Sequence, residues 1–346
     1  MIKLLFYVSK LYSIPVVSPV FLEAKRRGIP AAFYVSRKVS LNLPEVFFSA
    51  PVYTDLSHAR RFAPDFVLCP GNFVDFRLPG RKVQLFHGIG VEKPSHYRIR
   101  HFFDYYLTSG PVVTERFRML ESKYRYFKTF ETGWPKIDHI MNYPRENLRG
   151  TYSIPHHSRV ILYAPTHSAG MESASALINV IDGQIGRDEI WFCKPHEFMN
   201  RELLHQIRQT GARVIEHYDI TPYLHLADVL IGDTSSVVYE FMALDKPVVT
   251  YRTAGRADKG IDIQHPEELR AALDRSLARP DEFSLQRRKH LLEVNPVRDG
   301  TISRTILELL SSLDPAVSPG NRRKPLNLFR KMQIVYHSCL RKGYLR

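Results

Sequence analysis

Cysteine is scarce in this sequence. The 346 residues contain three, far apart at positions 69, 193 and 339. That number and spacing exclude a disulfide framework and argue against the closely spaced ligand pairs of a zinc site. We therefore expect Cys69, Cys193 and Cys339 to be ordinary thiols in a reducing compartment, and we place the protein in the cytoplasm.

Long apolar runs are also missing. No run approaches the ~20 residues needed to cross a bilayer. Residues 1–8 resemble a signal peptide only superficially, because they carry one positive charge and lead to Ser9-Lys10 without a small-residue cleavage site. We interpret them as a first β-strand. A chain of 346 residues that is 44% hydrophobic is long enough for two domains with proper cores.

Positive charge dominates, but unevenly. Residues 1–150 carry a net charge of +11, residues 151–311 carry −4, and residues 312–346 carry +7. Such an excess suits an anionic acceptor or an anionic surface. Nucleic acid would fit the charge too, but the chain has no zinc-finger spacing, basic heptad region or RNA-recognition sequence, so we do not expect it as a partner.

Short apolar runs alternate with helical stretches, the pattern of an α/β protein. The strands expected in the first half are residues 3–8, 31–35, 66–69, 83–86, 105–108 and 127–129. Those expected in the second half are residues 159–165, 189–193, 212–215, 229–231 and 248–251. Helices are expected between them, including residues 201–209, 266–277 and 301–310. The simplest architecture is two doubly wound, Rossmann-like domains facing each other across a cleft.

A polar, proline-containing connection over residues 142–153 is typical of a linker between domains. We therefore expect an acceptor-side domain over residues 1–150, a nucleotide-donor domain over residues 151–311, and a basic tail over residues 312–346.

The most informative stretch is residues 227–249, which predicts a strand, a polar turn, a helix over residues 237–244 and a second strand. Four capping-type residues fill the turn: Asp233, Thr234, Ser235 and Ser236. Free N–H groups at a helix start can bind phosphate without a metal, so we favour a phosphate site over an ordinary helix cap. Glu240, one turn further on, is placed to take the hydroxyl pair of a ribose.

Three more loops follow predicted strands. His87-Gly88-Ile89-Gly90 puts an imidazole beside flexible backbone, which suits a general base, although a structural histidine is equally consistent with this loop alone. Thr166-His167-Ser168 and Lys194-Pro195-His196 offer hydroxyl, imidazole and ammonium groups. Together with the turn at Asp233 they indicate a diphosphate site without an obvious metal cluster. Gly133-Trp134-Pro135 is better explained as a structural turn.

With these motifs, the sequence resembles the CDP-glycerol glycerophosphotransferase family of teichoic acid and capsule polymer synthesis. The resemblance runs from about His87 to Tyr251. It depends on five motifs in the family's order: the His-Gly loop at His87, Gly133 to Asp138, Leu162 to Thr166, Lys194 to His196, and Ala227 to Ser236.

The resemblance implies a GT-B fold and transfer of glycerol phosphate from CDP-glycerol to a hydroxyl, with release of CMP and with neither metal ion nor cofactor. The catalytic residues would be His87, as general base, and His196. The donor-binding residues would be Thr166, His167, Lys194, Asp233, Thr234, Ser235, Ser236 and Glu240. The partners would be a CDP-linked polyol donor, a lipid-linked or polymeric glycan acceptor, and the inner face of the cell membrane.

Two departures from the family pattern leave alternatives open. Phe86 stands where the family has Trp, and Lys93 is displaced by one position. His167-Ser168 stands where the family commonly has an aromatic residue and Arg, which puts the identity of the donor in question more than the class of reaction. A nucleotide-sugar glycosyltransferase of the same fold is therefore one alternative. A non-catalytic relative that docks partners at the membrane is another.

The tail carries eight basic residues from Arg322 to Arg346 and no acidic one. Its apolar residues recur at helical spacing: Phe329, Met332, Val335, Tyr336, Cys339 and Leu340. Arg330, Lys331, Arg341 and Lys342 fall largely elsewhere on the helix surface. We favour a helix lying on an anionic membrane surface, with packing against the first domain as the alternative.

Overall fold

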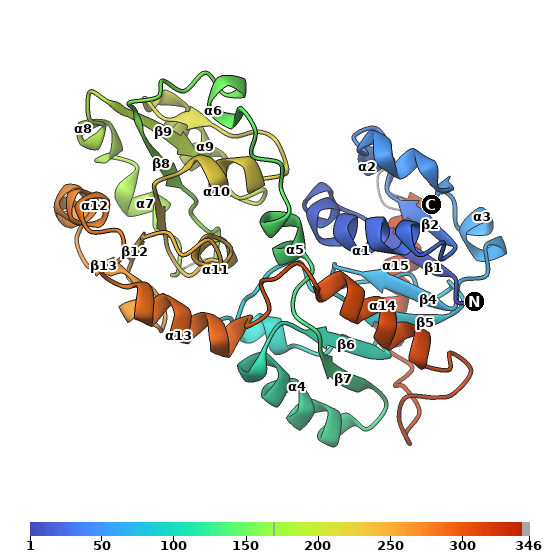
Figure 1. The fold of residues 1–346 in the computed structure, drawn as a ribbon. Helices are drawn as coiled ribbons and strands as arrows, with labels where there is room; N and C mark the ends of the chain where they lie inside the picture. Colours follow the sequence, from blue (N-terminus) through green and yellow to red (C-terminus); the bar gives the residue numbers. More distant parts are fainter. Residues whose placement is uncertain (169, 341–346) are drawn as a thin grey trace. The chain divides into compact units, whose positions relative to one another are not determined.

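The chain folds into two compact α/β units, seen in a computed structural model that describes residues 1–168 and 170–340 (Figure 1). The first unit contains Met1–His87, Pro94–Met141 and the chain from Val294 on. The second contains Gly88–Lys93 and Asn142–Glu293.

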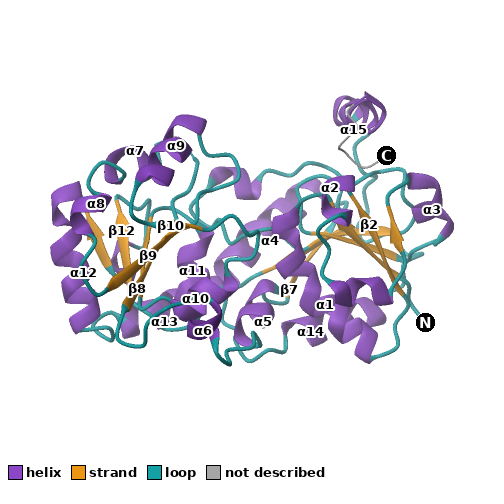
Figure 2. Cartoon of the chain, turned by 90° about the horizontal axis from the view of Figure 1, so that it is seen from above, coloured by secondary structure: helices purple, strands orange, loops and turns teal. Residues whose placement is uncertain are grey.

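The first unit is built on a parallel sheet whose seven strands, within the described residues, run in the order β3-β2-β1-β4-β5-β6-β7. Their bounds are β1 Leu4–Val8, β2 Ala31–Val35, β3 Val52–Tyr53, β4 Phe66–Cys69, β5 Arg81–Gln84, β6 Tyr105–Thr108 and β7 Lys128–Glu131. The register pairs Leu4 with Ala31 on one side and with Phe66 on the other. Helices surround this sheet (Figure 2). They are α1 Ile14–Arg26, α2 Arg37–Ser40, α3 Leu56–Arg61, α4 Pro111–Tyr124, α5 Lys136–Met141, α14 Ile302–Ser312 and α15 Leu328–Leu340.

Aromatic packing fills one part of this unit's core. The rings of Phe33 and Phe47 stack with centroids 4.6 Å apart, and Phe6 lies 5.2 Å from Phe33 on the adjacent strand. Phe21 of α1 meets Phe33 edge to face at 4.8 Å. All four side chains are buried, and such pairs contribute beyond their buried area.

The second unit has its own parallel sheet, in which six strands of the described chain follow the order β10-β9-β8-β11-β12-β13. Their bounds are β8 Arg159–Tyr163, β9 Glu189–Cys193, β10 Arg213–Val214, β11 Val229–Gly232, β12 Val248–Tyr251 and β13 Ile261–Ile263. The helices are α6 Leu148–Thr151, α7 Ala174–Leu177, α8 Ile181–Gln184, α9 Arg201–Gln209, α10 Thr221–Leu226, α11 Ser236–Met242, α12 Leu269–Ala278 and α13 Ser284–Val294.

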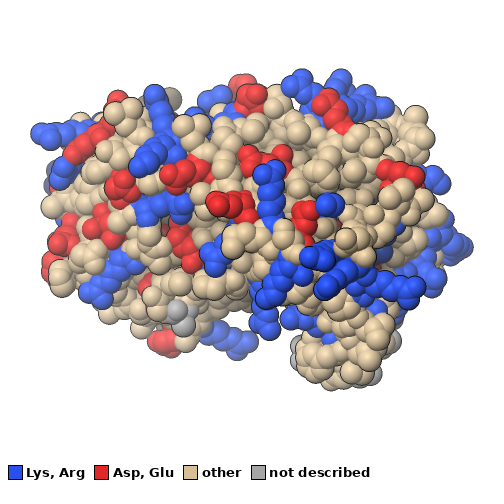
Figure 3. Space-filling model, turned by 90° about the horizontal axis from the view of Figure 1, so that it is seen from below, with Lys and Arg blue, Asp and Glu red and all other residues tan. Residues whose placement is uncertain are grey.

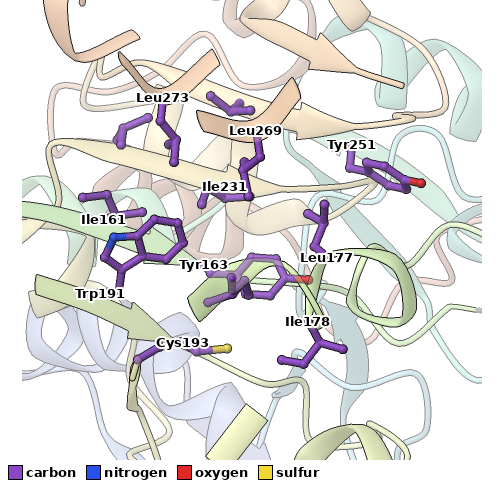
Figure 4. Packing of buried hydrophobic residues seen from close by; sticks show 14 of the residues in the cluster. Ile161, Tyr163, Leu177, Ile178, Trp191, Cys193, Ile231, Tyr251, Leu269 and Leu273 are labelled. Carbon is purple, nitrogen blue, oxygen red and sulfur yellow. The ribbon is translucent and has the colours of Figure 1, made fainter. Parts of the chain in front are cut away.

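Side chains from the strands and from α12 form the core of the second unit (Figure 4). Ile161 and Ile231 come from neighbouring strands, Trp191 from the next one, and Leu269 and Leu273 from the helix. Strands buried on both faces read as continuous apolar runs, which is why this sheet could be recognised from the sequence.

The predicted α/β architecture is confirmed, with three differences in detail. The short strands β3 and β13 were not predicted from the sequence. Residues 294–311 were predicted in the second domain but belong to the first unit, because the apolar face of α14 is buried there at Ile302, Ile306 and Leu310. Residues 88–93 and 142–150 were predicted in the first domain but belong to the second unit.

The tail forms the predicted helix, α15. Lys324 pairs with Asp104 at 2.9 Å, and Asn327 Nδ2 donates to the carbonyl of Arg100 at 2.8 Å, so the chain leading into the helix is tied to the first unit. Phe329 and Met332 remain 69% and 62% exposed. Arg341 and Lys342 lie outside the described residues, as do the side chains of Cys339 and Leu340.

Candidate functional site

Three neighbouring strands of the second unit, β9, β8 and β11, each end in a loop that carries predicted site residues. In parallel strands the carboxyl ends share one edge of the sheet, where open α/β sheets bind their ligands. Thr166 and His167 follow β8, Lys194 and His196 follow β9, and Asp233 follows β11.

Asp233 holds the loop after β8. The backbone N–H of Thr166 lies 3.0 Å from each of its carboxylate oxygens, and Oδ2 also accepts from the N–H and the hydroxyl of Ser173, both at 2.9 Å. The side chain is 1% exposed. Burial raises its pKa to about 6, although these hydrogen bonds act in the opposite direction. Asp233 thus lies behind the loop, where it shapes the site rather than lining it.

Lys93 reaches the same loop from the segment that follows His87. Its ammonium donates to Thr166 Oγ1 at 2.9 Å and to Ser168 Oγ at 3.2 Å. Burial lowers the pKa of Lys93, and the carboxylates of Asp233 and Glu92 oppose that effect. From the sequence, Lys93 was identified only as a displaced motif residue and was not predicted in the site.

Glu92 fixes the segment Gly88–Lys93 in the second unit. Its Oε1 accepts from the hydroxyl of Tyr239 on α11 and from Arg256 Nη1, the latter at 3.3 Å. Gly88 lies against α11 as well, because a Cβ placed on it would come within 2.9 Å of Ser236 Oγ. No pattern in the sequence signalled these contacts, which join residues more than a hundred positions apart.

Two of the predicted histidines stack on each other. The rings of His167 and His196 lie 3.8 Å apart between centroids, and Phe198 packs against both, at 5.6 and 5.7 Å. Burial and the nearby Lys93 lower the pKa of His167, which favours a neutral ring. Lys194 Nζ lies 3.4 Å from the carbonyl of Ile215, at the same end of the sheet.

The turn before α11 is organised as a helix cap. Ser235 is the N-cap residue, and its Oγ accepts from the N–H of Val237 at 3.4 Å. Thr234 Oγ1 accepts from the N–H of Ala254 at 2.9 Å, so it supports the loop after β12. The helix spans seven residues and begins one residue earlier than predicted. Glu240 lies within it and is 2% exposed.

His87 belongs to the first unit, whereas every other predicted site residue belongs to the second. Its side chain is exposed, and its ring centroid lies 5.5 Å from that of Tyr12. Phe86, just before it, has a left-handed φ of 59°, and the indole N–H of Trp134 donates to the Phe86 carbonyl at 3.1 Å. Trp134 is 1% exposed, so the predicted structural role of the Gly-Trp-Pro turn is confirmed.

Neither a metal cluster nor a membrane-spanning helix was found in the parts of the chain that the structure describes. Across residues 1–168 and 170–340, no three His, Cys, Asp or Glu side chains are grouped so that they could hold a metal ion. No helix in those residues is long and apolar enough to cross a membrane.

Comparison with protein families gives one match over most of the second unit and part of the first. The family described as CDP-glycerol:poly(glycerophosphate) glycerophosphotransferase matches residues 91–311.

Two similar relatives come from Bacillus spizizenii strain W23. The teichoic acid poly(glycerol phosphate) polymerase is 27% identical over 163 residues, covering 43% of this chain and 41% of the relative. The teichoic acid glycerol-phosphate primase is 26% identical over 174 residues, covering 47% and 45%. This chain therefore aligns with less than half the length of either.

Solved structures share the fold at low identity. The wall teichoic acid polymerase TagF aligns with a TM-score of 0.67 at 15% identity, covering 89% of this chain and 88% of that one. The UDP-GlcNAc 2-epimerase from Neisseria meningitidis, bound to UDP-GlcNAc, aligns with a TM-score of 0.63 at 15% identity, covering 90% and 100%. These likenesses confirm the predicted GT-B type of fold.

Proposed function

The chain belongs to the CDP-glycerol:poly(glycerophosphate) glycerophosphotransferase family, and we propose that it transfers glycerol phosphate, or a related polyol phosphate, from a CDP-activated donor to a hydroxyl of a lipid-linked or polymeric cell-envelope glycan. The observation that supports this most is the family match, which covers the loops after β8, β9 and β11 and the segment from Val91 to Lys93. The named relatives are a teichoic acid poly(glycerol phosphate) polymerase and a teichoic acid glycerol-phosphate primase.

In the proposed reaction, His87 removes the proton of the acceptor hydroxyl. The acceptor oxygen then forms a bond to the outer phosphorus of the donor, and the bond from that phosphorus to the bridging oxygen breaks. The electron pair of that bond leaves with CMP. The exposure of His87 suits a base that must meet an incoming acceptor.

The second unit would bind the donor. His196, His167, Lys194, Thr166, Ser235 and Ser236 would contact the diphosphate and stabilise the charge that moves onto the departing CMP. Asp233 and Thr234 would act through the loops they hold, since their side chains are 1% and 3% exposed. Glu240 would hold the ribose. Its side chain is 2% exposed, so this role requires the side chain to become accessible when the donor binds.

A nucleotide-sugar glycosyltransferase remains the second candidate. Ser168 is a serine at a position where the family commonly has arginine, and a protein bound to UDP-GlcNAc shares this fold. Because a fold alone does not determine the donor, the nucleobase of the donor and the group that is transferred must be tested directly.

The test is a donor panel. Purified protein is incubated with CDP-glycerol, CDP-ribitol, UDP-GlcNAc and UDP-glucose together with a glycan-lipid acceptor analogue, and the release of CMP, UMP or UDP is measured. CMP release that requires the acceptor supports the proposal. UDP release from a sugar donor would support the glycosyltransferase instead. Binding without turnover of any donor would favour the non-catalytic alternative.

We also propose that α15 rests on an anionic lipid surface at the inner face of the membrane. Phe329, Met332 and Tyr336 are more than half exposed, although exposed apolar side chains on a terminal helix are costly in water. Lys and Arg side chains gather beside the lobe formed by this helix (Figure 3). Arg330 and Lys331 lie over the rings of Phe73 and Phe76, so part of the helix also packs on the first unit.

A further inference from the structure

Lys93 carries a positive charge that hydroxyl groups hold in place rather than a carboxylate. Its ammonium contacts Thr166 Oγ1 and Ser168 Oγ, and in the described part of the chain it forms no salt bridge. The nearest candidates are engaged elsewhere: Glu92 pairs with Arg256 and Tyr239, and Asp233 accepts from backbone N–H groups. The carboxylates of Asp233 and Glu92 favour the charged form of Lys93 from a distance but do not pair with it, so a bound anion would supply the direct ionic partner of this half-buried ammonium.

The two hydroxyls are oriented by the same contact. An oxygen that accepts from an ammonium keeps its own hydrogen for donation, so Thr166 and Ser168 can each donate outward. The stacked ring of His167 is close enough for Lys93 to lower its pKa. An ammonium, two hydroxyl donors and an imidazole together provide the groups that charge-assisted binding of a phosphate uses.

We propose that Lys93 binds the diphosphate of the nucleotide donor, together with the hydroxyls of Thr166 and Ser168, and balances the charge that develops on the leaving phosphate. This inference rests on the proposed function, since it takes the donor to be a nucleoside diphosphate. It also explains the contacts of Glu92 with Tyr239 and Arg256. They hold the segment Gly88–Lys93 in the second unit, so the lysine is in position before the donor arrives.

The test compares ligands that differ only in phosphate. Binding of cytidine, CMP and CDP is measured by calorimetry for the full-length protein and for Lys93→Gln. The variant is expected to bind CDP about 10- to 100-fold more weakly, the effect of one charge-assisted hydrogen bond, and to bind cytidine within about twofold of the parent. Lys289→Gln, which removes an exposed lysine of the same unit, is the matched control and should change neither affinity.

Two further variants keep the inference falsifiable if Lys93→Gln alters folding. Lys93→Arg should retain most of the CDP affinity. Adding Ser168→Arg to Lys93→Gln should recover part of it, because the side chain of residue 168 reaches the place that the ammonium occupies. The inference is overturned if Lys93→Gln binds CDP like the parent, or if it weakens cytidine and CDP binding equally.

A parallel series with uridine, UMP and UDP separates this inference from the proposed donor. If uridine ligands bind and cytidine ligands do not, while Lys93→Gln still removes the gain from the second phosphate, the CDP donor is wrong and Lys93 is a diphosphate residue. If cytidine ligands are preferred and Lys93→Gln has no effect, the donor stands and the inference about Lys93 fails.

Discussion

The indole N–H of Trp134 donates to the carbonyl of Phe86 at 3.1 Å, one residue before the proposed base His87. Phe86 has a left-handed φ, a conformation that a residue with a bulky side chain adopts only when its surroundings enforce it. The backbone N–H of Trp134 is itself fixed by Asn295 Oδ1 at 2.9 Å. A buried turn far along the chain therefore determines where the peptide leading into His87 lies.

We predict that Trp134→Phe lowers turnover by about tenfold and leaves CDP affinity unchanged. The variant keeps an aromatic ring but removes the donor to Phe86, which releases the loop and leaves a buried carbonyl unpaired at a cost of about 1–3 kcal/mol. Steady-state kinetics and calorimetry measure the two effects. The matched control is Trp191→Phe, which removes the indole bond to Glu189 in the second unit and should reduce stability without a comparable loss of turnover. Unchanged kinetics in Trp134→Phe would mean that the loop does not depend on this bond.

His87→Ala should abolish transfer while donor binding stays within a few fold. Loss of a general base costs roughly 10²–10⁴-fold in rate, and all the other predicted donor residues lie in the second unit. Acceptor-dependent CMP release and CDP affinity are the two measurements. His58→Ala, at an exposed histidine of the first unit, should behave like the parent. Near-normal turnover in His87→Ala would make this histidine structural and place the base elsewhere.

Asp233 should make the protein less stable as the pH rises from about 4 to about 6. Burial raises the pKa of Asp233 in the folded state to about 6, above its ordinary value of 3.8, so the folded state binds more protons than the unfolded chain in that window. Ionisation of Asp233 therefore costs up to about 3 kcal/mol, an effect fully present above pH 6 and relieved as the pH falls towards 4.

Urea unfolding of the parent and of Asp233→Asn, followed from pH 4 to pH 7.5, tests this. The variant should lack this part of the pH dependence. It should also be less stable near pH 4.5, because an amide nitrogen would face the N–H donors of Thr166 or Ser173. Parallel pH profiles for the two proteins would contradict the assignment.

Ser235→Ala combined with Ser236→Ala should weaken CDP-donor binding by about tenfold. Ser235 caps α11 and Ser236 begins it, so the change removes two hydroxyls and a cap worth about 1 kcal/mol. The control is Ser36→Ala, which removes the cap of α2 in the first unit and should lower stability without affecting donor binding. Equal donor affinity in the double variant and the parent would remove this turn from the site.

Transfer should persist in EDTA, because the proposed site stabilises the diphosphate with imidazole, hydroxyl and ammonium groups. The measurement is acceptor-dependent CMP release before and after chelation. Complete loss of activity that Mg²⁺ or Mn²⁺ restores would overturn the metal-free mechanism.

Much of the fold could be predicted because strands buried on both faces appear in the sequence as apolar runs. The strands Ala31–Val35, Phe66–Cys69 and Glu189–Cys193 were predicted with the bounds observed. The edge strands Val52–Tyr53 and Ile261–Ile263 are too short to produce such a signal. They form where the neighbouring strand offers free backbone groups, which is a tertiary effect.

Site residues that directly follow strands could be predicted from the sequence. Contacts between segments far apart in the sequence could not. The loops at Thr166, Lys194 and Asp233 follow β8, β9 and β11, so their position at one sheet edge follows from the order of elements. Lys93 reaches Thr166 across 73 positions of sequence, and no local pattern predicts that contact. The inward direction of Asp233 also depends on its partners, because a capping residue and a buried support look alike in sequence.

The last prediction concerns α15. Deleting residues 328–346 should reduce association with anionic vesicles by more than tenfold while transfer to a soluble acceptor analogue persists. The deletion removes the exposed apolar residues and five basic ones, each worth about 1 kcal/mol near such a surface. It spares Lys324 and Asn327, whose contacts with Asp104 and Arg100 help hold the first unit together.

Vesicle sedimentation at rising salt is the measurement for α15. Binding of the parent should fall as salt rises, because screening limits surface charge to a reach of about 8 Å at physiological ionic strength. Phe329→Ser with Met332→Ser is the matched variant that keeps every charge. As salt is raised, it should lose vesicle binding at a lower salt concentration than the parent. If the deletion instead unfolds the protein or abolishes soluble activity, α15 is a structural helix of the first unit, and the +11 charge of residues 1–150 becomes the candidate for attraction to the membrane or the acceptor.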